Sequence, residues 1–116
     1  MYNKVFLIGR LVRDPDVRVT VSGINVSRFT IAVDKGYRNK DNEQQQTADF
    51  IRLVTWRRLA EIAGQYLKKG KLIAVEGRLQ MDTYEKEGVQ RESAEIVVDQ
   101  LQMLDRAQDS TAPPAV

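Results

Sequence analysis

Apolar and polar residues alternate, or gather into short apolar runs, in five stretches of the chain. Residues 24–34 show the alternation clearly, with Phe29, Ile31 and Val33 at every second position. Because successive side chains of a strand point to opposite faces, this period of two predicts β-strands. The predicted strands cover residues 3–13, 24–34, 49–56 and 71–81, and a fifth follows a hairpin turn near Glu87 and Gly88.

The period changes in residues 57–69, where four apolar residues recur at the spacing i, i+3, i+4 and i+7. This spacing places them on one side of an amphipathic helix and therefore in the core. Lys68 and Lys69 favour the C-terminal end of this helix, and Gly70 suits the residue that follows a helix. The four residues of the apolar stripe are Leu59, Ile62, Ala63 and Tyr66.

The order of these elements predicts an all-β fold with one helix. It fits a five-stranded OB-fold barrel in which the helix between strands 3 and 4 covers one end. Closing a small barrel requires bends, and Gly9 and Gly77 lie within the first and fourth strands. An α+β sandwich of the same elements is the alternative. Residues 1–105 form the predicted domain, and the polar residues 106–116 are predicted to be disordered.

Composition excludes most kinds of catalytic site. The 116 residues include no cysteine and no histidine, so the usual metal ligands and histidine-activated nucleophiles are absent. The nearest pair of carboxylates, Asp14 and Asp16, flanks a proline, and a turn explains that pattern. We therefore expect neither an enzyme nor a cofactor. Because no apolar run approaches the roughly 20 residues of a membrane span, we expect a soluble, cytoplasmic protein.

Charge is spread unevenly along the chain. Residues 1–40 hold eight lysines and arginines against three acidic residues, and residues 50–78 hold seven against two. Residues 79–104 hold two against six. Although the net charge is only +2, this distribution predicts one basic and one acidic face, which suits a polyanionic partner. An ordinary solvated surface is the alternative interpretation.

The predicted third strand has an unusual outer face. Ile51 and Leu53 suit the barrel interior, which leaves the residues of the other parity outside. A large apolar side chain that stays exposed loses the stabilisation of roughly 1.5–3 kcal/mol that its burial would provide. An arginine between two aromatic residues suits a ligand that is flat and negatively charged, and single-stranded nucleic acid is both. The outer residues are Phe50, Arg52, Val54 and Trp56.

Three segments of the chain resemble the bacterial single-stranded DNA-binding protein family. They are "NKVFLIGRLVRDPDVR", "DFIRLVTWRRLAEIAGQYLKKG", and "VEGRL" with "TY" shortly after it. The resemblance runs from about Asn3 to Leu104. It implies an OB-fold that assembles as a homotetramer and wraps single-stranded DNA without sequence specificity in replication, recombination and repair, or in DNA uptake.

The same resemblance implies a set of DNA-binding residues. Plainer interpretations stay open for some of them: Trp56 as a core or interface anchor, Tyr84 as a cross-strand pair, and Lys69 as a charge near a helix end. A surface ion pair is the alternative for Arg52. The family's aromatic stacking positions fall on Tyr37, Phe50, Trp56 and Tyr84, and its basic positions on Arg38, Arg52, Arg58 and Lys69.

The chain departs from the family pattern after the fourth strand and at its end. Gln80, Asp82 and Thr83 stand where better-studied members carry basic residues, which lowers the expected attraction for phosphate. The family's acidic tail, which recruits replication and repair enzymes, has no counterpart in "DSTAPPAV", so such recruitment is not expected. A short paralogue such as the competence-associated type, a phage or plasmid member, and a truncated chain all stay open.

The predicted first strand is apolar on both faces. The barrel interior covers only one of them, so the other requires a partner. Because the neighbourhood of this strand forms the dimer contact in the family, and two dimers then pair, we expect a homotetramer, with a dimer as the fallback. One face carries Val5, Leu7 and Leu11, and the other carries Phe6, Ile8 and Val12.

A second function stays open beside binding of single-stranded DNA. An OB-fold RNA-binding or primosome-type accessory protein would share the barrel and its aromatic residues. Stacking does not involve the 2′-hydroxyl group, so aromatic side chains alone do not distinguish RNA from DNA.

Overall fold

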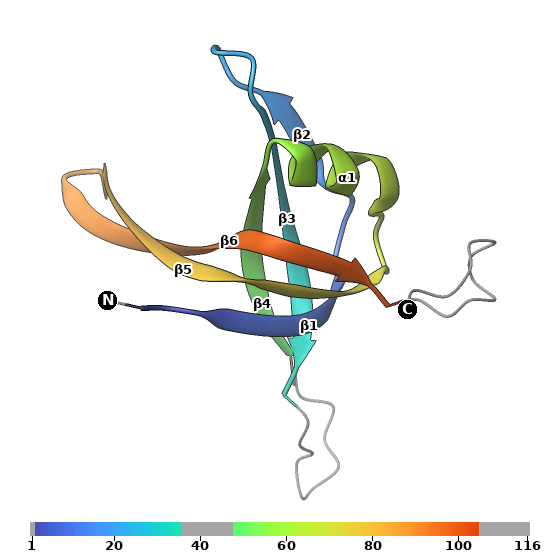
Figure 1. Cartoon of the computed structure of the whole chain (residues 1–116). Helices are drawn as coiled ribbons and strands as arrows, with labels where there is room; N and C mark the ends of the chain where they lie inside the picture. The colour runs from blue at the N-terminus through green and yellow to red at the C-terminus, as the bar shows by residue number, and fades with distance from the viewer. Residues whose placement is uncertain (1, 36–47, 105–116) are drawn as a thin grey trace, which may run out of the picture.

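The computed structural model describes residues 2–35 and 48–104. Within these residues the chain forms six strands and one helix (Figure 1). The strands are β1 (Val5–Leu11), β2 (Asp16–Val19), β3 (Asn25–Asp34), β4 (Ala48–Trp56), β5 (Leu72–Lys86) and β6 (Val89–Met103), and the helix is α1 (Arg58–Tyr66).

Five of the strands close into a barrel. Antiparallel pairs join β1 to β5, β5 to β6, β3 to β4 and β1 to β3, and a parallel pair joins β4 to β6. This ring confirms the predicted five-stranded OB-fold barrel.

The short strand β2 was not predicted. It pairs with the edge of β3 outside the ring, and all four of its residues are exposed. Its sequence, DVRV, alternates polar and apolar residues, but over only four residues directly after a proline turn this alternation is a weak strand signal. With β2 counted, α1 lies between β4 and β5, whereas the sequence placed the helix between strands 3 and 4.

Two glycines allow strands to approach closely where the ring closes. A Cβ on Gly9 would lie 2.5 Å from the carbonyl oxygen of Ala32, at the point where β1 passes from β5 to β3. A Cβ on Gly77 would overlap the carbonyl oxygen of Val97, and the β5–β6 register shifts beside Gly77. The irregularity predicted at Gly77 is therefore confirmed, and at Gly9 the absence of a side chain permits the contact between β1 and β3.

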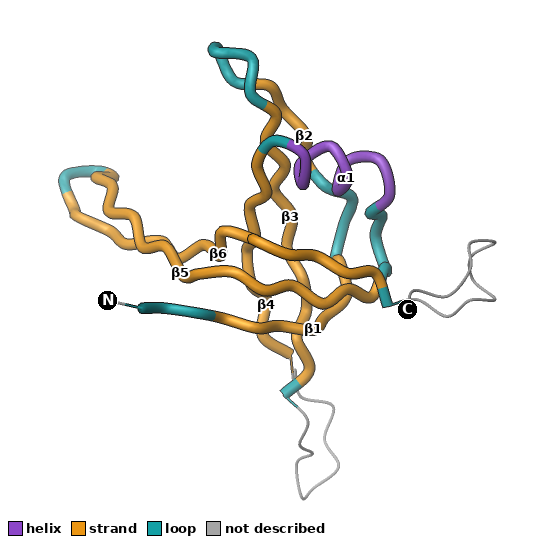
Figure 2. Tube along the Cα trace, viewed as in Figure 1, coloured by secondary structure: helices purple, strands orange, loops and turns teal. Residues whose placement is uncertain are grey.

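Helix α1 covers one end of the barrel beside β2 (Figure 2). Ala63 and, just beyond the helix, Leu67 are buried in the same cluster as Phe29 and Leu53. The helix is shorter than predicted, because the chain turns at Leu67 into an extended conformation with φ −88° and ψ 141°. Leu67 enters the core in place of Tyr66, whose side chain is 50% exposed. The prediction that Tyr66 is a core residue was wrong.

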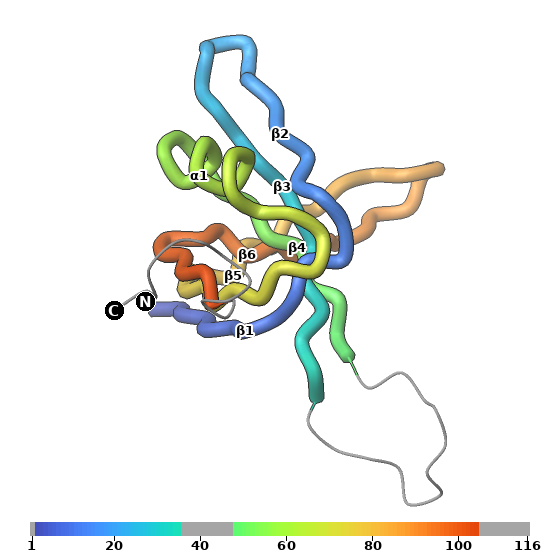
Figure 3. Tube along the Cα trace, turned by 90° about the vertical axis from the view of Figure 1, so that its right-hand side faces the viewer, coloured from blue at the N-terminus to red at the C-terminus, as the bar shows by residue number. Residues whose placement is uncertain are grey.

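Beyond the barrel, β5 and β6 continue as a two-stranded hairpin, residues 79–95, that we call the arm (Figure 3). Glu87 (φ 54°) and Gly88 (φ 78°) form its turn, as predicted, and two successive positive φ angles are typical of a type I′ hairpin. The predicted fourth strand was too short, since β5 runs to Lys86. The last nine residues of β5 are all exposed, so no buried face marked this part of the strand in the sequence.

Candidate nucleic-acid interface

The outer face of β4 carries three of the predicted DNA-binding side chains in a row. Phe50, Arg52 and Trp56 lie on one side of the strand, because side chains two residues apart share a face. The intervening Leu53 and Thr55 are buried, which confirms which side of β4 points inward. Phe50 is 54% exposed and Trp56 is 40% exposed, so both aromatic side chains are open to a ligand.

Val54 lies on the same outer side, but it is not exposed as predicted. Only 1% of its surface is accessible, and it packs with Val26 of β3 and Val97 of β6. Val54 and Val97 are in register across the β4–β6 pair. The alternation along β4 could not show this burial, because the covering neighbour comes from a strand much later in the chain.

The chain turns sharply between β4 and α1, directly after Trp56. Arg57 adopts φ 59° and ψ −123°, a conformation that costs a non-glycine residue on the order of 1–3 kcal/mol. Its N–H donates to the carbonyl oxygen of Asn25 (2.8 Å), and its carbonyl accepts from the N–H of Glu61 (3.1 Å). The turn places Arg58 at the start of α1, two residues after Trp56.

Tyr84 lies on the arm, on the face that continues the outer face of β4. It pairs in register with Arg91 of β6. From Arg91, every second residue of β6 leads back on the same side to Val97, which pairs with Val54. Trp56 and Tyr84 therefore belong to one continuous sheet face, and Tyr84 is 47% exposed.

Lys69 lies in the loop between α1 and β5 and not on a strand of this face. Its backbone N–H donates to Oδ1 of Asp14 (2.9 Å), which ties the loop to the segment joining β1 and β2. The next residue, Gly70, has a φ of +91° and donates its N–H to the carbonyl oxygen of Leu11 (2.8 Å). Gly70 was predicted to follow the helix directly, and it lies instead beyond the turn at Leu67.

A hollow opens on the outer face beside Arg52, between β3, β4 and the segment that joins β1 and β2. Two of its arginines, Arg13 and Arg28, were not among the predicted site residues. The alternation in residues 24–34 could have placed Arg28 outside the barrel, whereas Arg13 was included in the predicted first strand and lies beyond the end of β1 at Leu11. We call this site the charged hollow, and its charged residues are Arg13, Asp14, Asp16, Arg28, Arg52 and Glu95.

Two predicted contacts, Tyr37 and Arg38, lie outside the described residues, as does the predicted disordered segment 106–116. Over residues 2–35 and 48–104, no helix is long and apolar enough to cross a membrane. The same residues contain no group of three or more acidic side chains that could hold a metal ion.

The outer face combines aromatic rings with free positive charge. The rings of Phe50, Trp56 and Tyr84 can each stack on a flat ligand. Within the described part of the chain, Arg52 and Arg58 form no ion pair, so both guanidinium groups are available to an anion. The arrangement suits a polymer that alternates flat and anionic groups.

Comparison with known proteins identifies the family. The single-strand binding protein family matches residues 2–104. The single-stranded DNA-binding protein of Thermotoga maritima is 49% identical over 106 residues, which cover 90% of this chain and 75% of that protein. Single-stranded DNA-binding protein 1 of Staphylococcus aureus (strain MSSA476) is 44% identical over 106 residues, covering 90% of this chain and 67% of that protein. The chain therefore belongs to the single-strand binding protein family.

Proposed function

We propose that this protein binds single-stranded DNA without sequence preference and protects it during replication, recombination, repair or DNA uptake. The observation that carries the proposal is the outer face of β4, where Phe50 and Trp56 are exposed on either side of Arg52. Membership of a DNA-binding, non-enzymatic family supports it. Such a role places the protein in the cytoplasm with the nucleoid.

Stacking provides the sequence-independent part of the binding. Each base presents a flat π-face, so Phe50, Trp56 and Tyr84 accept any of the four bases. A base stacked on an aromatic side chain contributes about 1–3 kcal/mol. Arg52 and Arg58 provide the electrostatic part, because their guanidinium groups, which pair with no described residue, can bind the phosphates that join the stacked bases.

The path of the DNA follows from the positions of these residues. We propose that the strand runs along β4 past Trp56, Arg52 and Phe50, and that it reaches Tyr84 over the outer face of the arm. We assign the same function to Tyr37 and Arg38, which follow β3 in the sequence, and to Lys69 beside the segment that joins β1 and β2. The DNA-binding domain then comprises residues 1–105.

Fluorescence of Trp56 tests the proposal directly, because it is the only tryptophan in the chain. Adding poly(dT) should quench its emission, since a stacked base changes the surroundings of the indole. Unchanged emission at saturating DNA, with binding shown by an independent method, would remove Trp56 from the stacking residues. Tighter binding to poly(U) than to poly(dT) of the same length would favour the RNA-binding alternative.

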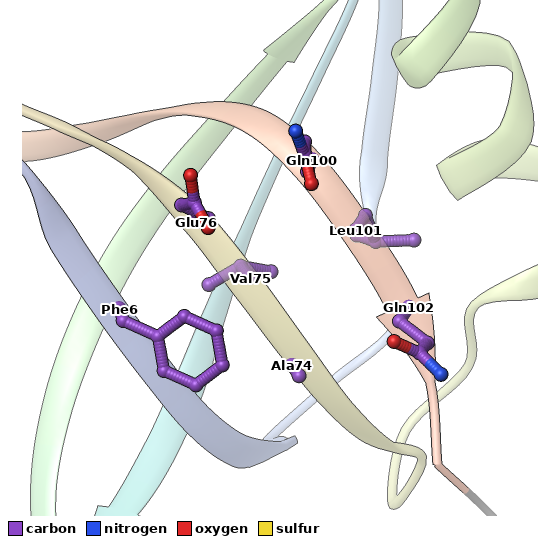
Figure 4. A pocket seen from close by; sticks show the side chains of 7 residues that line it. All are labelled: Phe6, Ala74, Val75, Glu76, Gln100, Leu101 and Gln102. Carbon is purple, nitrogen blue, oxygen red and sulfur yellow. The ribbon is translucent and has the colours of Figure 1, made fainter.

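We further propose that the protein assembles as a homotetramer, with a dimer as the fallback, through the outer side of β1. Phe6 is 62% exposed and Ile8 is 47% exposed, whereas Val5 and Leu7 of the other parity pack against the core. Figure 4 shows the ring of Phe6 beside Ala74 and Glu76 of β5. A second copy that covers this face would bury both exposed side chains.

Subunit number tests the assembly. Light scattering at micromolar concentration should give four times the mass of one chain, or twice that mass for the fallback dimer. A monomer at this concentration would contradict the proposal.

A further inference from the structure

The charged hollow contains as many arginines as carboxylates, three of each. Two of its carboxylates are held by residues outside its lining. Asp14 accepts a hydrogen bond from the backbone N–H of Lys69 (2.9 Å), and Asp16 forms an ion pair with Arg18 (3.2 Å). Both carboxylates therefore have partners other than the arginines of the hollow.

The third carboxylate, Glu95, is paired inside the hollow. Its Oε2 lies 2.9 Å from Nε of Arg28. This pair joins the base of the arm to the outer side of β3. The side chain of Glu95 is only 16% exposed, compared with 54% for that of Arg28. Glu95 is therefore the more buried partner, and part of the Arg28 side chain stays accessible.

Two arginines of the hollow differ from Arg28 in their pairing. Within the described residues, neither Arg13 nor Arg52 forms an ion pair. A guanidinium group presents several N–H donors in one plane, a geometry that matches phosphate oxygens. Arg52 also lies between Phe50 and Trp56 on β4, so an anion bound in the hollow is adjacent to the stacking residues.

We propose that the charged hollow binds one phosphate of the single-stranded DNA backbone between Arg13 and Arg52, and that Glu95 limits the strength of this binding by neutralising Arg28. The inference rests on the proposed function and adds to it a defined phosphate position, a new contact residue (Arg13) and a residue that weakens binding (Glu95). Removing the charge of Glu95 would free Arg28 as a third donor.

Salt dependence of poly(dT) binding tests the role of Arg13. Each phosphate contact with single-stranded DNA contributes about 0.7 to the slope of log affinity against log salt concentration, which amounts to roughly eightfold between 1 M and 50 mM salt. Arg13→Gln should therefore make the slope shallower by up to about 0.7, since Arg52 still contacts the same phosphate. Arg10→Gln is the matched control, because Arg10 does not line the hollow and already donates to the carbonyl oxygen of Gly70 (3.0 Å).

Substitutions in the Arg28–Glu95 pair test the second half of the proposal. Glu95→Gln should tighten binding and make the slope steeper by up to about 0.7. Glu92→Gln is its matched control, since Glu92 pairs with Thr83 on the opposite face of the arm from Tyr84. Arg28→Gln should weaken binding, because it leaves Glu95 as an unneutralised charge beside the phosphate. The double variant should bind about as tightly as the unaltered protein.

The outcomes separate this inference from the proposed function. If poly(dT) quenches Trp56 but Arg13→Gln behaves like Arg10→Gln, or Glu95→Gln like Glu92→Gln, the phosphate position is wrong and DNA binding stands. If the unaltered protein shows no binding, the proposed function itself fails. Misfolding cannot imitate the expected result, because Glu95→Gln is expected to bind more tightly.

Discussion

The barrel face around β4 and the arm are parts of one sheet surface, yet they differ in charge and in burial. Residues 50–60 of the barrel side carry Arg52, Arg57 and Arg58 and no acidic residue. The arm, residues 79–95, carries five acidic residues against Lys86 and Arg91. In β4, Leu53 and Thr55 are fully buried, whereas the β5 half of the arm is exposed on both sides.

This difference shows which constraint acts on each region. In the barrel, the buried side fixes the register of β4 and so fixes the spacing of Phe50, Arg52 and Trp56 on the other side. In the arm, no residue is fully buried, and the pairing depends on backbone hydrogen bonds and on the turn at Glu87 and Gly88. The barrel therefore provides a rigid aromatic platform, and the arm adds Tyr84 on a less stable extension.

Placing a charge at an exposed apolar position should affect assembly on the barrel but not on the arm. This is the largest difference that we expect between the two regions. Phe6→Asp should abolish the oligomer, because a charge buried at a subunit contact without a partner costs several kcal/mol. Met81→Asp is the matched change on the arm, where Met81 is 51% exposed, and it should leave the subunit number unchanged. Light scattering measures both, and dissociation by Met81→Asp would move the contact to the arm.

Truncation of side chains should separate the stability of the two regions. Leu53→Ala should lower the free energy of unfolding by about 2–5 kcal/mol, because it leaves a cavity in the core. Leu79→Ala, on the arm, should lower it by under about 1 kcal/mol, since Leu79 is already 40% exposed. Denaturation at one fixed protein concentration gives both values, and equal losses would contradict the comparison.

Removal of stacking rings should weaken DNA binding more on the barrel than on the arm. Trp56→Ala should reduce the free energy of poly(dT) binding by about 2–3 kcal/mol and Tyr84→Ala by about 1 kcal/mol, because ordering the arm offsets part of the stacking gain. Tyr66→Ala is the control: Tyr66 is exposed on α1, and its removal should leave the affinity unchanged. A larger loss of affinity for Tyr84→Ala than for Trp56→Ala would show that the arm contributes more to stacking than the barrel does.

Replacing an acidic residue of the arm with lysine should make the arm attract DNA more strongly, as the basic barrel face does. Asp82 pairs with Ser93 on the side of the arm that carries Tyr84. Asp82→Lys should therefore strengthen binding at low salt and make the salt slope steeper by up to about 0.7. Glu92→Lys places the same charge on the other side of the arm and should have the smaller effect. Identical slopes for the two variants would show that only net charge matters.

Substitution of Arg57, in the turn directly after Trp56, should have the smallest effect of these changes. Arg57→Gly should raise the free energy of unfolding by about 0.5–1 kcal/mol, because glycine adopts a positive φ without strain. Arg57→Ala keeps the Cβ and should give no gain. Denaturant titration of both variants measures their free energies of unfolding. Equal stabilities of Arg57→Gly and Arg57→Ala would show that the positive φ of residue 57 is not a source of strain.

Features that depend on neighbouring residues could be predicted from the sequence alone. Alternation or a short apolar run marked the five strands of the barrel, and the i, i+3, i+4 pattern marked α1. The turn at Glu87 and Gly88 followed from the need for positive φ angles in a tight hairpin. The outward placement of Phe50, Arg52 and Trp56 followed from the period of two and from the buried Leu53. Each of these signals is local, so the chain carries it before any tertiary contact forms.

Features that depend on residues distant in the chain follow only from the packing of the folded protein. Val54 is buried because Val97 of β6 lies beside it. Tyr66 is exposed because Leu67 takes its place in the core. Arg13, Arg28 and Glu95 meet in one hollow, although no spacing in the sequence connects them. Strand register and the closure of the barrel bring these residues together, and a pattern within one segment does not encode which segment will lie next to it.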